Sequence, residues 1–348
     1  MRHRKRSRVG LAMLLVAVVA AACGGGSEDE PQAQASPEED ITLTVYSGRE
    51  EEFIGPLFES VEKETGFELD VRYGDSAELA ATILEEGEAS PADVFVSQDA
   101  GSLGAVAEED LFTPLDEEIL ERVDERFRST DGLWVGTSGR ARVAAYNTEE
   151  VAPEDLPDSI LGFTESEWKG RIGFPPTNSS FQAFVGAMIL TEGEDATRSF
   201  LEGLVANDPR TYEDNSATVR AIADGEIDVG FVNHYYIYEV SAEDGDIPVA
   251  NHFFTAGDPG ALVNSAGAGI LAQSDDAEAA AEFVDLLTGD LGQRYFAEET
   301  FEYPVVTDVP PGEELVPLED IDSPDVDLSD LGGVLEPALT LLAEVGLL

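Results

Sequence analysis

Strand-like and helix-like segments alternate along most of this chain, and that alternation constrains its fold more than any other feature. Short apolar runs at residues 41–46, 67–71 and 92–96 are each followed by a segment whose apolar residues have helical spacing. Parallel strands joined by crossover helices produce this order, so the sequence predicts an α/β fold with a parallel sheet. About 300 residues carry the pattern, which is long for one domain and favours two lobes.

Two long extended runs, at residues 133–147 and 249–270, are the expected connections between the lobes. Each run is long enough to pass from one lobe to the other, and the second is rich in glycine. Two α/β lobes joined by two extended crossover strands would enclose a cleft. The predicted boundaries place residues 41–138 and 264–308 in the first lobe, and residues 139–263 and 309–348 in the second.

The first 22 residues have the composition of an export signal. Five basic residues between positions 2 and 8 precede an apolar run at residues 9–22, which is too short to cross a membrane as a stable helix. The run ends in Ala-Ala-Ala-Cys, which resembles a bacterial lipoprotein cleavage site, and Cys23 is the only cysteine. We expect a signal peptide at residues 1–22 and lipidation of Cys23, although a plain signal with a chance cysteine is the alternative.

Residues 23–40 are rich in glycine, serine, glutamate and proline and show no apolar periodicity. This composition predicts a disordered linker between the lipid and the folded part. The protein would then be extracytoplasmic and anchored to the cell membrane by lipidated Cys23. We expect it to be a monomer.

The chain is strongly acidic, with 19 Lys and Arg against 73 Asp and Glu. Removal of the five basic residues of the signal would leave 14 basic groups and a net charge near −59. Such a surface repels nucleic acid and anionic lipid, so neither is an expected partner, and the only membrane contact would be the lipid anchor. We interpret the acidity as a solvated, halophile-like coat without a binding role.

Two adjacent tyrosines, Tyr235 and Tyr236, mark the candidate ligand site. They follow the apolar run at residues 227–232, a predicted buried strand, and they begin a predicted helix. Ligands of open α/β sheets bind at the carboxyl ends of strands. Two phenol oxygens at such a position could converge on one hard cation, although an ordinary aromatic pair in the core is the alternative.

The available ligand chemistry favours a hard cation. The mature chain has only two histidines, His234 and His252, and no free thiolate once Cys23 is acylated. It therefore has few of the imidazole and sulfur ligands that zinc, copper and iron–sulfur sites need. Phenolate oxygen favours ferric iron, whose charge displaces the phenol proton. Calcium is the competing hard ion, but the sequence has no Asp-x-Asp-x-Asp-Gly loop.

Several groups suited to an anion lie in turns and at predicted helix starts. Arg49, Arg140 and Arg142 fall near predicted strand ends, and Ser138-Gly139-Arg140 could hold an anion with backbone N–H groups and a guanidinium. Residues 177–180 and 215–216 begin helices, which attract anions. Ordinary N-capping is the alternative for each of these helix starts.

Six stretches, taken in order, resemble the ferric-ion-binding substrate proteins of bacterial iron ABC transporters. The resemblance runs from about residue 41 to residue 348, and the stretches are Val45-Tyr-Ser-Gly-Arg49, Ser90-Pro-Ala-Asp-Val-Phe95, Ser138-Gly-Arg-Ala-Arg-Val143, Trp168-Lys-Gly-Arg-Ile-Gly173, Pro176-Thr-Asn178 and Val232-Asn-His-Tyr-Tyr236. It implies a two-lobed periplasmic-binding-protein fold of type II that closes on Fe3+. It also implies delivery of the ion to an ABC permease.

The resemblance implies residue roles as well. The paired iron tyrosines of the family fall on Tyr235 and Tyr236, and a third tyrosine used by some members falls on Tyr146. A synergistic anion, such as carbonate or phosphate, accompanies the ion in the family. Its binding positions fall on Ser138, Gly139, Arg140, Asn178 and Asn233.

The chain departs from the family pattern in the first lobe. Glu50 stands where many members carry a histidine, and Gln98, followed by Asp99, stands where others carry a carboxylate. Either Glu50 or Asp99 supplies an oxygen to the metal, or Arg49 holds a carbonate-like anion that completes the shell. We favour the Arg49 arrangement, and we expect His234 to pack beside the metal site without binding it.

A receptor is the expected class of protein, and an enzyme is not. Ser138 and Ser180 lack the Gly-x-Ser-x-Gly context of a hydrolase nucleophile, and neither remaining histidine has a motif partner. The alternative function is a receptor of the same fold for an organic or phosphorylated solute, such as a phosphonate, thiamine or a polyamine. In that case the tyrosines would sandwich the solute.

Overall fold

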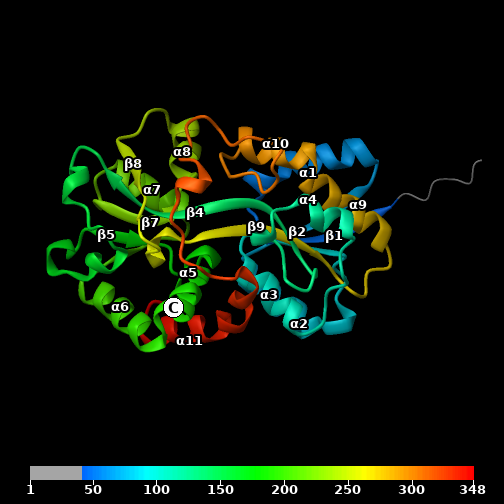
Figure 1. Cartoon of the computed structure of the whole chain (residues 1–348), viewed down its shortest axis with the longest axis horizontal. Coiled ribbons are helices and arrows are strands. Elements are labelled where there is room, and N and C mark those ends of the chain that lie inside the picture. Colours follow the sequence, from blue (N-terminus) through cyan, green and yellow to red (C-terminus); the bar gives the residue numbers. More distant parts are fainter. Residues whose placement is uncertain (1–40) are drawn as a thin grey trace, which may run out of the picture. The chain divides into compact units, whose positions relative to one another are not determined.

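The computed structural model of the chain describes residues 41–348, in which one nine-stranded sheet carries helices on both faces (Figure 1). The predicted signal peptide, Cys23 and the predicted linker lie outside these residues. The strands follow the spatial order β2-β1-β3-β9-β4-β7-β5-β6, and β8 pairs with β4 beside this path. Their bounds are β1 Thr42–Ser47, β2 Glu68–Tyr73, β3 Val94–Ser97, β4 Val135–Asn147, β5 Ile172–Phe174, β6 Arg210–Thr211, β7 Val229–Asn233, β8 Val249–His252 and β9 Val263–Ile270.

The sheet is parallel toward its two ends and antiparallel in its middle. β1 pairs in parallel with β2 and β3, and β5 pairs in parallel with β6 and β7. β4 and β9 run antiparallel to each other and to the strands beside them. The predicted α/β fold with extended crossover strands is therefore confirmed. The lobe boundaries stay a prediction, because residues 41–348 cluster within a single compact unit.

β4 connects the two parallel groups of strands. All of its 13 residues are buried. Residues 135–141 pair with β9, whereas residues 142–146 pair with β7, so the partner changes in the middle of the strand. Ser138, Arg140 and Arg142 are among these buried residues, so the strand brings polar side chains into the interior.

The second predicted run, at residues 249–270, is not one continuous strand. β8 ends at His252, and a 3-10 turn at Pro259–Ala261 precedes β9. Pro259 has no N–H to donate to a strand ladder, and Asp258 Oδ1 accepts a hydrogen bond of 2.8 Å from the Gly260 N–H. The proline and its capping aspartate therefore divide the run into two strands.

Eleven α-helices lie within the described residues, and none of them is both long and apolar enough to cross a membrane. α5 is buried on all sides through its first ten residues, and α3 and α5 begin with side-chain caps from Asp99 and Asn178. The bounds are α1 Glu51–Thr65, α2 Ser76–Glu86, α3 Ala100–Glu108, α4 Glu117–Arg122, α5 Ser179–Glu192, α6 Glu194–Ala206, α7 Asn215–Ala223, α8 Tyr236–Asp244, α9 Ala277–Thr288, α10 Asp290–Glu298 and α11 Leu335–Glu344.

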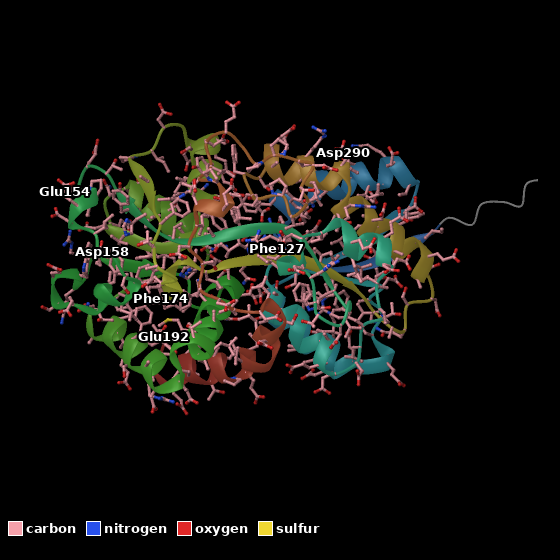
Figure 2. All side chains as sticks on the ribbon, viewed as in Figure 1. Phe127, Glu154, Asp158, Phe174, Glu192 and Asp290 are labelled. Carbon is pink, nitrogen blue, oxygen red and sulfur yellow. The ribbon has the colours of Figure 1, made fainter. Side chains whose placement is uncertain are left out.

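Acidic side chains lie on the outside of the described part, as Figure 2 shows for Glu154, Asp158, Glu192 and Asp290. Phe174, by contrast, is fully buried. Carboxylates that point into solvent keep their hydration, so they add charge without requiring partners. This distribution agrees with the interpretation of the acidity as a solvated coat.

Candidate metal centre

Tyr235 and Tyr236 lie where β7 ends and α8 begins. β7 ends at Asn233, and Tyr235 already has helical backbone angles one residue before α8. Neither tyrosine exposes any surface, and their rings stack with centroids 4.3 Å apart and planes 29° apart. The sequence prediction of a tyrosine pair at the junction between a strand and a helix agrees with the structure.

The two phenol oxygens have different surroundings. Tyr236 Oη accepts a hydrogen bond of 3.1 Å from Gln98 Nε2, whereas Tyr235 Oη has no hydrogen-bond partner within residues 41–348. Burial raises the pKa of Tyr235, and the charges of Arg140 and Arg49 oppose that rise. Burial also raises the pKa of Tyr236 well above its usual value, and Tyr235 adds to the effect. A cation that bound both oxygens would satisfy Tyr235 and replace the phenol protons.

Glu50 is the first-lobe carboxylate beside the tyrosines. It immediately precedes α1 but does not cap that helix with its side chain. Burial and, next, repulsion by Asp214 raise its pKa to about 7. Its charge is also one of the causes that raise the pKa of Tyr236, so the two groups lie near each other. No helix cap uses the Glu50 carboxylate in the described residues, so it remains available as a candidate ligand.

Asp99, the alternative carboxylate, is used elsewhere. Its Oδ1 accepts a hydrogen bond of 2.9 Å from the Ser102 N–H and its Oδ2 accepts one of 3.0 Å from Ser102 Oγ, so it caps α3. Gln98 contributes its amide to the site, because Oε1 accepts from Ser179 Oγ at 3.1 Å while Nε2 donates to Tyr236. Of the three first-lobe candidates, Glu50 is the one whose carboxylate remains available.

Tyr146, the predicted third tyrosine ligand, does not join this group. On β4, Tyr146 pairs with Val229 while Arg142 pairs with Asn233, so Tyr146 lies at the end of β7 opposite to Tyr235. The separation from Arg142 along the strand is about 13 Å, at roughly 3.3 Å per residue. Its ring packs in the large hydrophobic core instead. The family position matched in sequence, but the strand register carries the side chain away, and we remove Tyr146 from the ligand set.

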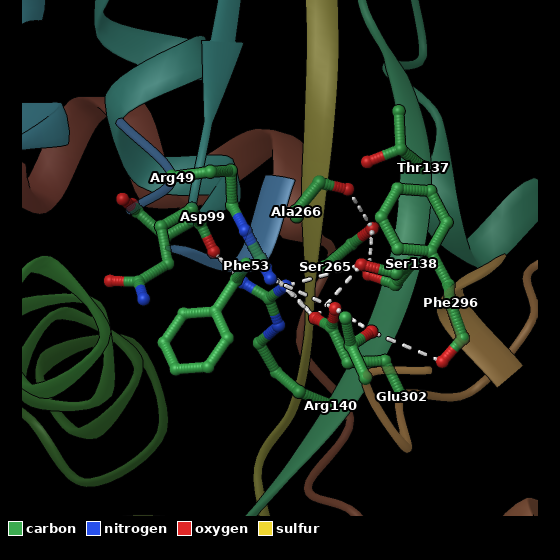
Figure 3. Close-up of polar contacts among 12 residues, drawn as sticks. Arg49, Phe53, Asp99, Thr137, Ser138, Arg140, Ser265, Ala266, Phe296 and Glu302 are labelled. Carbon is green, nitrogen blue, oxygen red and sulfur yellow. Dashed lines mark hydrogen bonds and ion pairs between the residues drawn. The ribbon is translucent and has the colours of Figure 1, made fainter. Parts of the chain in front are cut away.

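A buried carboxylate, that of Glu302, occupies the site where Arg49 and Arg140 were predicted to bind a free anion (Figure 3). Arg49 Nη1 and Nη2 donate to its two oxygens at 2.8 and 2.9 Å, and Ser138 Oγ donates at 3.0 Å. Arg140 forms a further ion pair with it, and Thr300 Oγ1 donates at 2.8 Å. Burial alone would raise the pKa of Glu302, but Arg49 and Arg140 outweigh burial and hold it at about 2.

This carboxylate changes the predicted anion site. Arg49, Ser138 and Arg140 were expected to bind a free anion, and in the structure they bind Glu302. The Gly139 N–H donates to the Tyr303 carbonyl at 2.7 Å, so it is also used within the protein. This arrangement could not be predicted from the sequence, because Glu302 lies 253 residues beyond Arg49.

Asn178 and Asn233, the other two predicted anion residues, lie beside Arg142. Asn233 is the β7 partner of Arg142, and partners in register place their side chains on the same face. Asn233 Nδ2 and Arg142 Nε are buried without hydrogen-bond partners in the described part of the chain. Arg142 Nη1 reaches Ser180 Oγ at 3.5 Å, next to the α5 cap Asn178. These donors could hold an anion.

Arg142 has no carboxylate partner within the described residues. Its Nη2 donates to the Phe231 carbonyl at 2.8 Å, and its guanidinium lies over the rings of Phe181 and Phe184. Burial lowers its pKa to about 9, and Tyr236 opposes the decrease. At neutral pH the group therefore stays cationic without a compensating carboxylate.

Glu239 is a site residue that the sequence interpretation missed. It lies on α8, one turn beyond the tyrosines, and is 7% exposed. Neither of its oxygens has a hydrogen-bond partner among residues 41–348. Burial and, next, Glu302 raise its pKa well above the usual value. The spacing of three and four residues from Tyr236 and Tyr235 was the available signal, because such positions share one helix face.

His234 packs beside the site, as expected. Its Nδ1 accepts from the Ala141 N–H at 3.2 Å, its Nε2 lies 3.0 Å from the Phe301 carbonyl, and its ring stacks on Tyr303. Burial lowers its pKa to about 3, so the ring is neutral. Both ring nitrogens are used in polar contacts with backbone groups, which leaves neither for a metal.

A cavity of about 800 Å³ is lined by residues 120, 125–130, 132, 263 and 321–328, and neither tyrosine is among them. Within the described residues, no group of three or more His, Cys, Asp and Glu side chains is arranged to hold a metal.

Comparison with known proteins identifies the family to which the chain belongs. A family model described as "Bacterial extracellular solute-binding protein" matches residues 89–322. The chain belongs to this family. It is therefore a solute-binding protein and not an enzyme, and its family is extracytoplasmic; both statements agree with the sequence predictions.

Similar proteins cover almost the whole described region. The solute-binding protein is 34% identical over 319 residues to the "Fe(3+)-binding periplasmic protein" of Serratia marcescens, across 91% of this chain and 93% of that one. Iron-bound HitA from Pseudomonas aeruginosa superimposes with a TM-score of 0.84 at 33% identity, across 88% of this chain and 99% of the other. A Trichodesmium protein (IdiA, FutA) in complex with iron and citrate gives a TM-score of 0.74 at 29% identity, across 88% and 100%. The predicted two-lobed type II periplasmic-binding fold is thereby confirmed.

Proposed function

We propose that this solute-binding protein is an extracytoplasmic Fe3+ receptor whose metal ligands are Tyr235, Tyr236 and Glu50. The observation that carries the proposal is the fully buried, stacked tyrosine pair, in which Tyr235 Oη has no partner within the described residues. Relatives and structural neighbours named for ferric iron, at about one-third identity over most of the chain, support the choice of ion. Phenolate and carboxylate oxygens suit a hard trivalent ion.

The receptor for an organic solute fits the geometry less well. A sandwiched solute needs two rings held apart, whereas Tyr235 and Tyr236 stack directly on each other at 4.3 Å. Burial also leaves Tyr235 Oη, and not a ring face, as the group without a hydrogen-bond partner in the described residues. The ring arrangement therefore favours a small ion over a flat organic molecule.

The proposal includes an accompanying anion. Arg49, Ser138, Gly139 and Arg140 are already bound within the protein, so the anion would bind at Asn178 and Asn233, beside Arg142. Arg142 supplies a positive charge with no carboxylate partner in the described region, which suits a carbonate- or phosphate-like anion. The Trichodesmium relative with iron and citrate supports the presence of an anion near the metal.

The remaining parts of the proposal concern location and delivery. We propose that residues 1–22 are removed, that Cys23 is lipidated, that the receptor is monomeric and that it passes Fe3+ to an ABC permease. A Cys23→Ala variant tests the anchor, because it should appear in the soluble fraction while the wild-type protein partitions with membranes. Membrane association of the variant equal to that of the wild type would contradict lipid anchoring.

The decisive experiment is a titration with ferric nitrilotriacetate, with and without bicarbonate or citrate. Coordination by tyrosinate should produce a visible charge-transfer band, and the double variant Tyr235→Phe/Tyr236→Phe should lose it. Tyr146→Phe is the matched control, because Tyr146 is a buried tyrosine distant from the pair. A colourless wild-type protein under every anion condition, or a double variant that keeps the band, would refute the proposal.

A further inference from the structure

Glu239 is a carboxylate whose position a purely structural role does not explain. It is 7% exposed, and both oxygens lack hydrogen-bond donors within the described residues. A buried polar group without a partner costs free energy of folding, and a buried charge costs more. Glu302, the other buried glutamate near Arg49, shows the contrast, because Arg49, Arg140, Ser138 and Thr300 all contact it.

Glu239 shares a helix face with the tyrosine pair. It follows Tyr235 by four residues and Tyr236 by three, and such positions are neighbours on a helix surface. Side chains on a helix lean toward its N-terminus, so the carboxylate of Glu239 leans toward the turn that carries the two phenols.

The charges of the centre balance when Glu239 is counted. Two phenolates and the carboxylates of Glu50 and Glu239 bring four negative charges, against three positive charges on Fe3+. Arg49 and Arg140 with Glu302 leave one positive charge beside them. Arg142 adds one further positive charge, which a singly charged anion such as bicarbonate would offset, so the sum with Glu239 is then zero. Without Glu239 the same cluster would keep an excess positive charge.

We infer that Glu239 is a further oxygen ligand of the ion, supplied by the same helix as Tyr236. The inference rests on the proposed function, since it assigns a residue to the same Fe3+ centre. The second lobe would then supply most of the ligands of the ion, namely Tyr235, Tyr236 and Glu239. Glu50 then closes the shell from the first lobe.

The test uses Glu239→Gln, which keeps the shape of the side chain and removes its charge. Ferric nitrilotriacetate is titrated against the full chain, and three quantities are measured: the Fe3+ affinity, the position of the tyrosinate band and the Tm of the metal-free protein. The matched control is Glu243→Gln, on the same helix one turn further, where the side chain is exposed and pairs with Arg220. The control should retain the wild-type affinity.

We expect effects of opposite sign in Glu239→Gln. The metal-free protein should become more stable, because an unpartnered buried carboxylate is removed, while Fe3+ affinity falls at least tenfold and the band shifts. A loss of threefold or more, with an unchanged or raised Tm, supports the inference. A smaller loss, or parallel losses of Tm and affinity, overturns it. If Glu239→Gln does not fold, Glu239→Asp decides by the same threefold criterion.

The outcome is separable from that of the proposed function. If the wild-type protein shows no tyrosinate band, the Fe3+ proposal itself fails, whatever Glu239 does. If the wild-type protein shows the band and Glu239→Gln binds Fe3+ like the wild type, only the role of Glu239 fails.

Discussion

Arg49 donates through Nη1 and Nη2 to both carboxylate oxygens of Glu302, a residue 253 positions further along the chain. Both side chains are at most 2% exposed. The pair joins the loop before α1 to the segment after α10, and it fills the place where a free anion was expected. It therefore serves as a fixed internal counter-charge beside the tyrosines.

Replacing Glu302 with glutamine should destabilise the fold strongly. Arg49 and Arg140 would remain buried without their carboxylate, and removal of one partner of a buried ion pair costs roughly 3–5 kcal/mol. Chemical denaturation at pH 7 would measure the free energy of unfolding. Glu226→Gln is the control, because its pair with Arg210 is about half exposed and should contribute only about 0–1 kcal/mol. Equal, small effects of both substitutions would contradict the importance of the buried pair.

The same pair should make stability depend on acid. The pKa of Glu302 is about 2 in the folded protein against 4.5 ordinarily, so the unfolded state binds the proton more readily. Its contribution is thus complete above about pH 4.5 and is lost as the pH falls toward 2. The difference in unfolding free energy between the wild type and Glu302→Gln should shrink across that window. A constant difference from pH 6 to pH 3 would argue against this assignment.

Gln98 should tune the metal centre through Tyr236. Its Nε2 donates to Tyr236 Oη at 3.1 Å, and hydrogen bonds to charged oxygens are worth roughly 1.5–3 kcal/mol. Gln98→Ala should therefore lower Fe3+ affinity by about tenfold or more and shift the tyrosinate band. The control is Gln273→Ala, whose amide donates to the Ser90 carbonyl and not to a tyrosine. An unshifted band with unchanged affinity would show that this contact does not affect the metal.

Arg142 should determine how Fe3+ binding responds to anions. Its Nε and the neighbouring Asn233 Nδ2 lack acceptors within the described residues, so Arg142→Gln should remove most of the gain in affinity that bicarbonate or citrate provides. The variant's affinity without added anion should change less. Arg72→Gln, at a half-exposed position on β2, controls for the loss of a positive charge. Wild-type anion dependence in Arg142→Gln would place the anion elsewhere.

Gly104 should be intolerant of even a methyl group. A Cβ at this position would lie 2.8 Å from the Gly332 Cα, because α3 packs directly against the 3-10 helix at Leu328–Val334. Gly104→Ala should destabilise the protein by about 1–3 kcal/mol through overpacking. Gly55→Ala, whose added methyl would meet its nearest atom at 3.7 Å, should instead stabilise α1 by about 0.5–1 kcal/mol. Thermal unfolding of the two variants would decide, and equal shifts would contradict the close packing.

The sequence predicted those features that depend on local order. Alternating strands and helices required an α/β fold, and the apolar run before Tyr235 located the tyrosine pair at the end of β7. The extended run at residues 133–147 also predicted β4 to within two residues at its start. In each case the information lay within about 15 consecutive residues, where hydrophobic periodicity is informative.

The features that the sequence could not predict depend on contacts between distant segments. Tyr146 matched a family position, yet the antiparallel register of β4 and β7 carries it to the wrong end of the strand. The role of Glu302 could not be predicted because its charged partners, Arg49 and Arg140, lie more than 160 residues away in the chain. Glu239 was different, since its helical spacing from the tyrosines was readable, but its isolation from hydrogen-bond donors appears only in the folded structure.

Tyr235 and Tyr236 expose no surface at all, and this has a kinetic consequence for any ion they hold. A chelator in solution cannot reach the phenol oxygens until the surrounding residues move apart. The rate of ion release would therefore depend on the rate of that opening. A higher chelator concentration would increase the rate of ion removal only up to a plateau. At the plateau, the rate at which the protein opens is limiting. A permease that favoured the open form would then accelerate release, and the ion would stay bound in its absence.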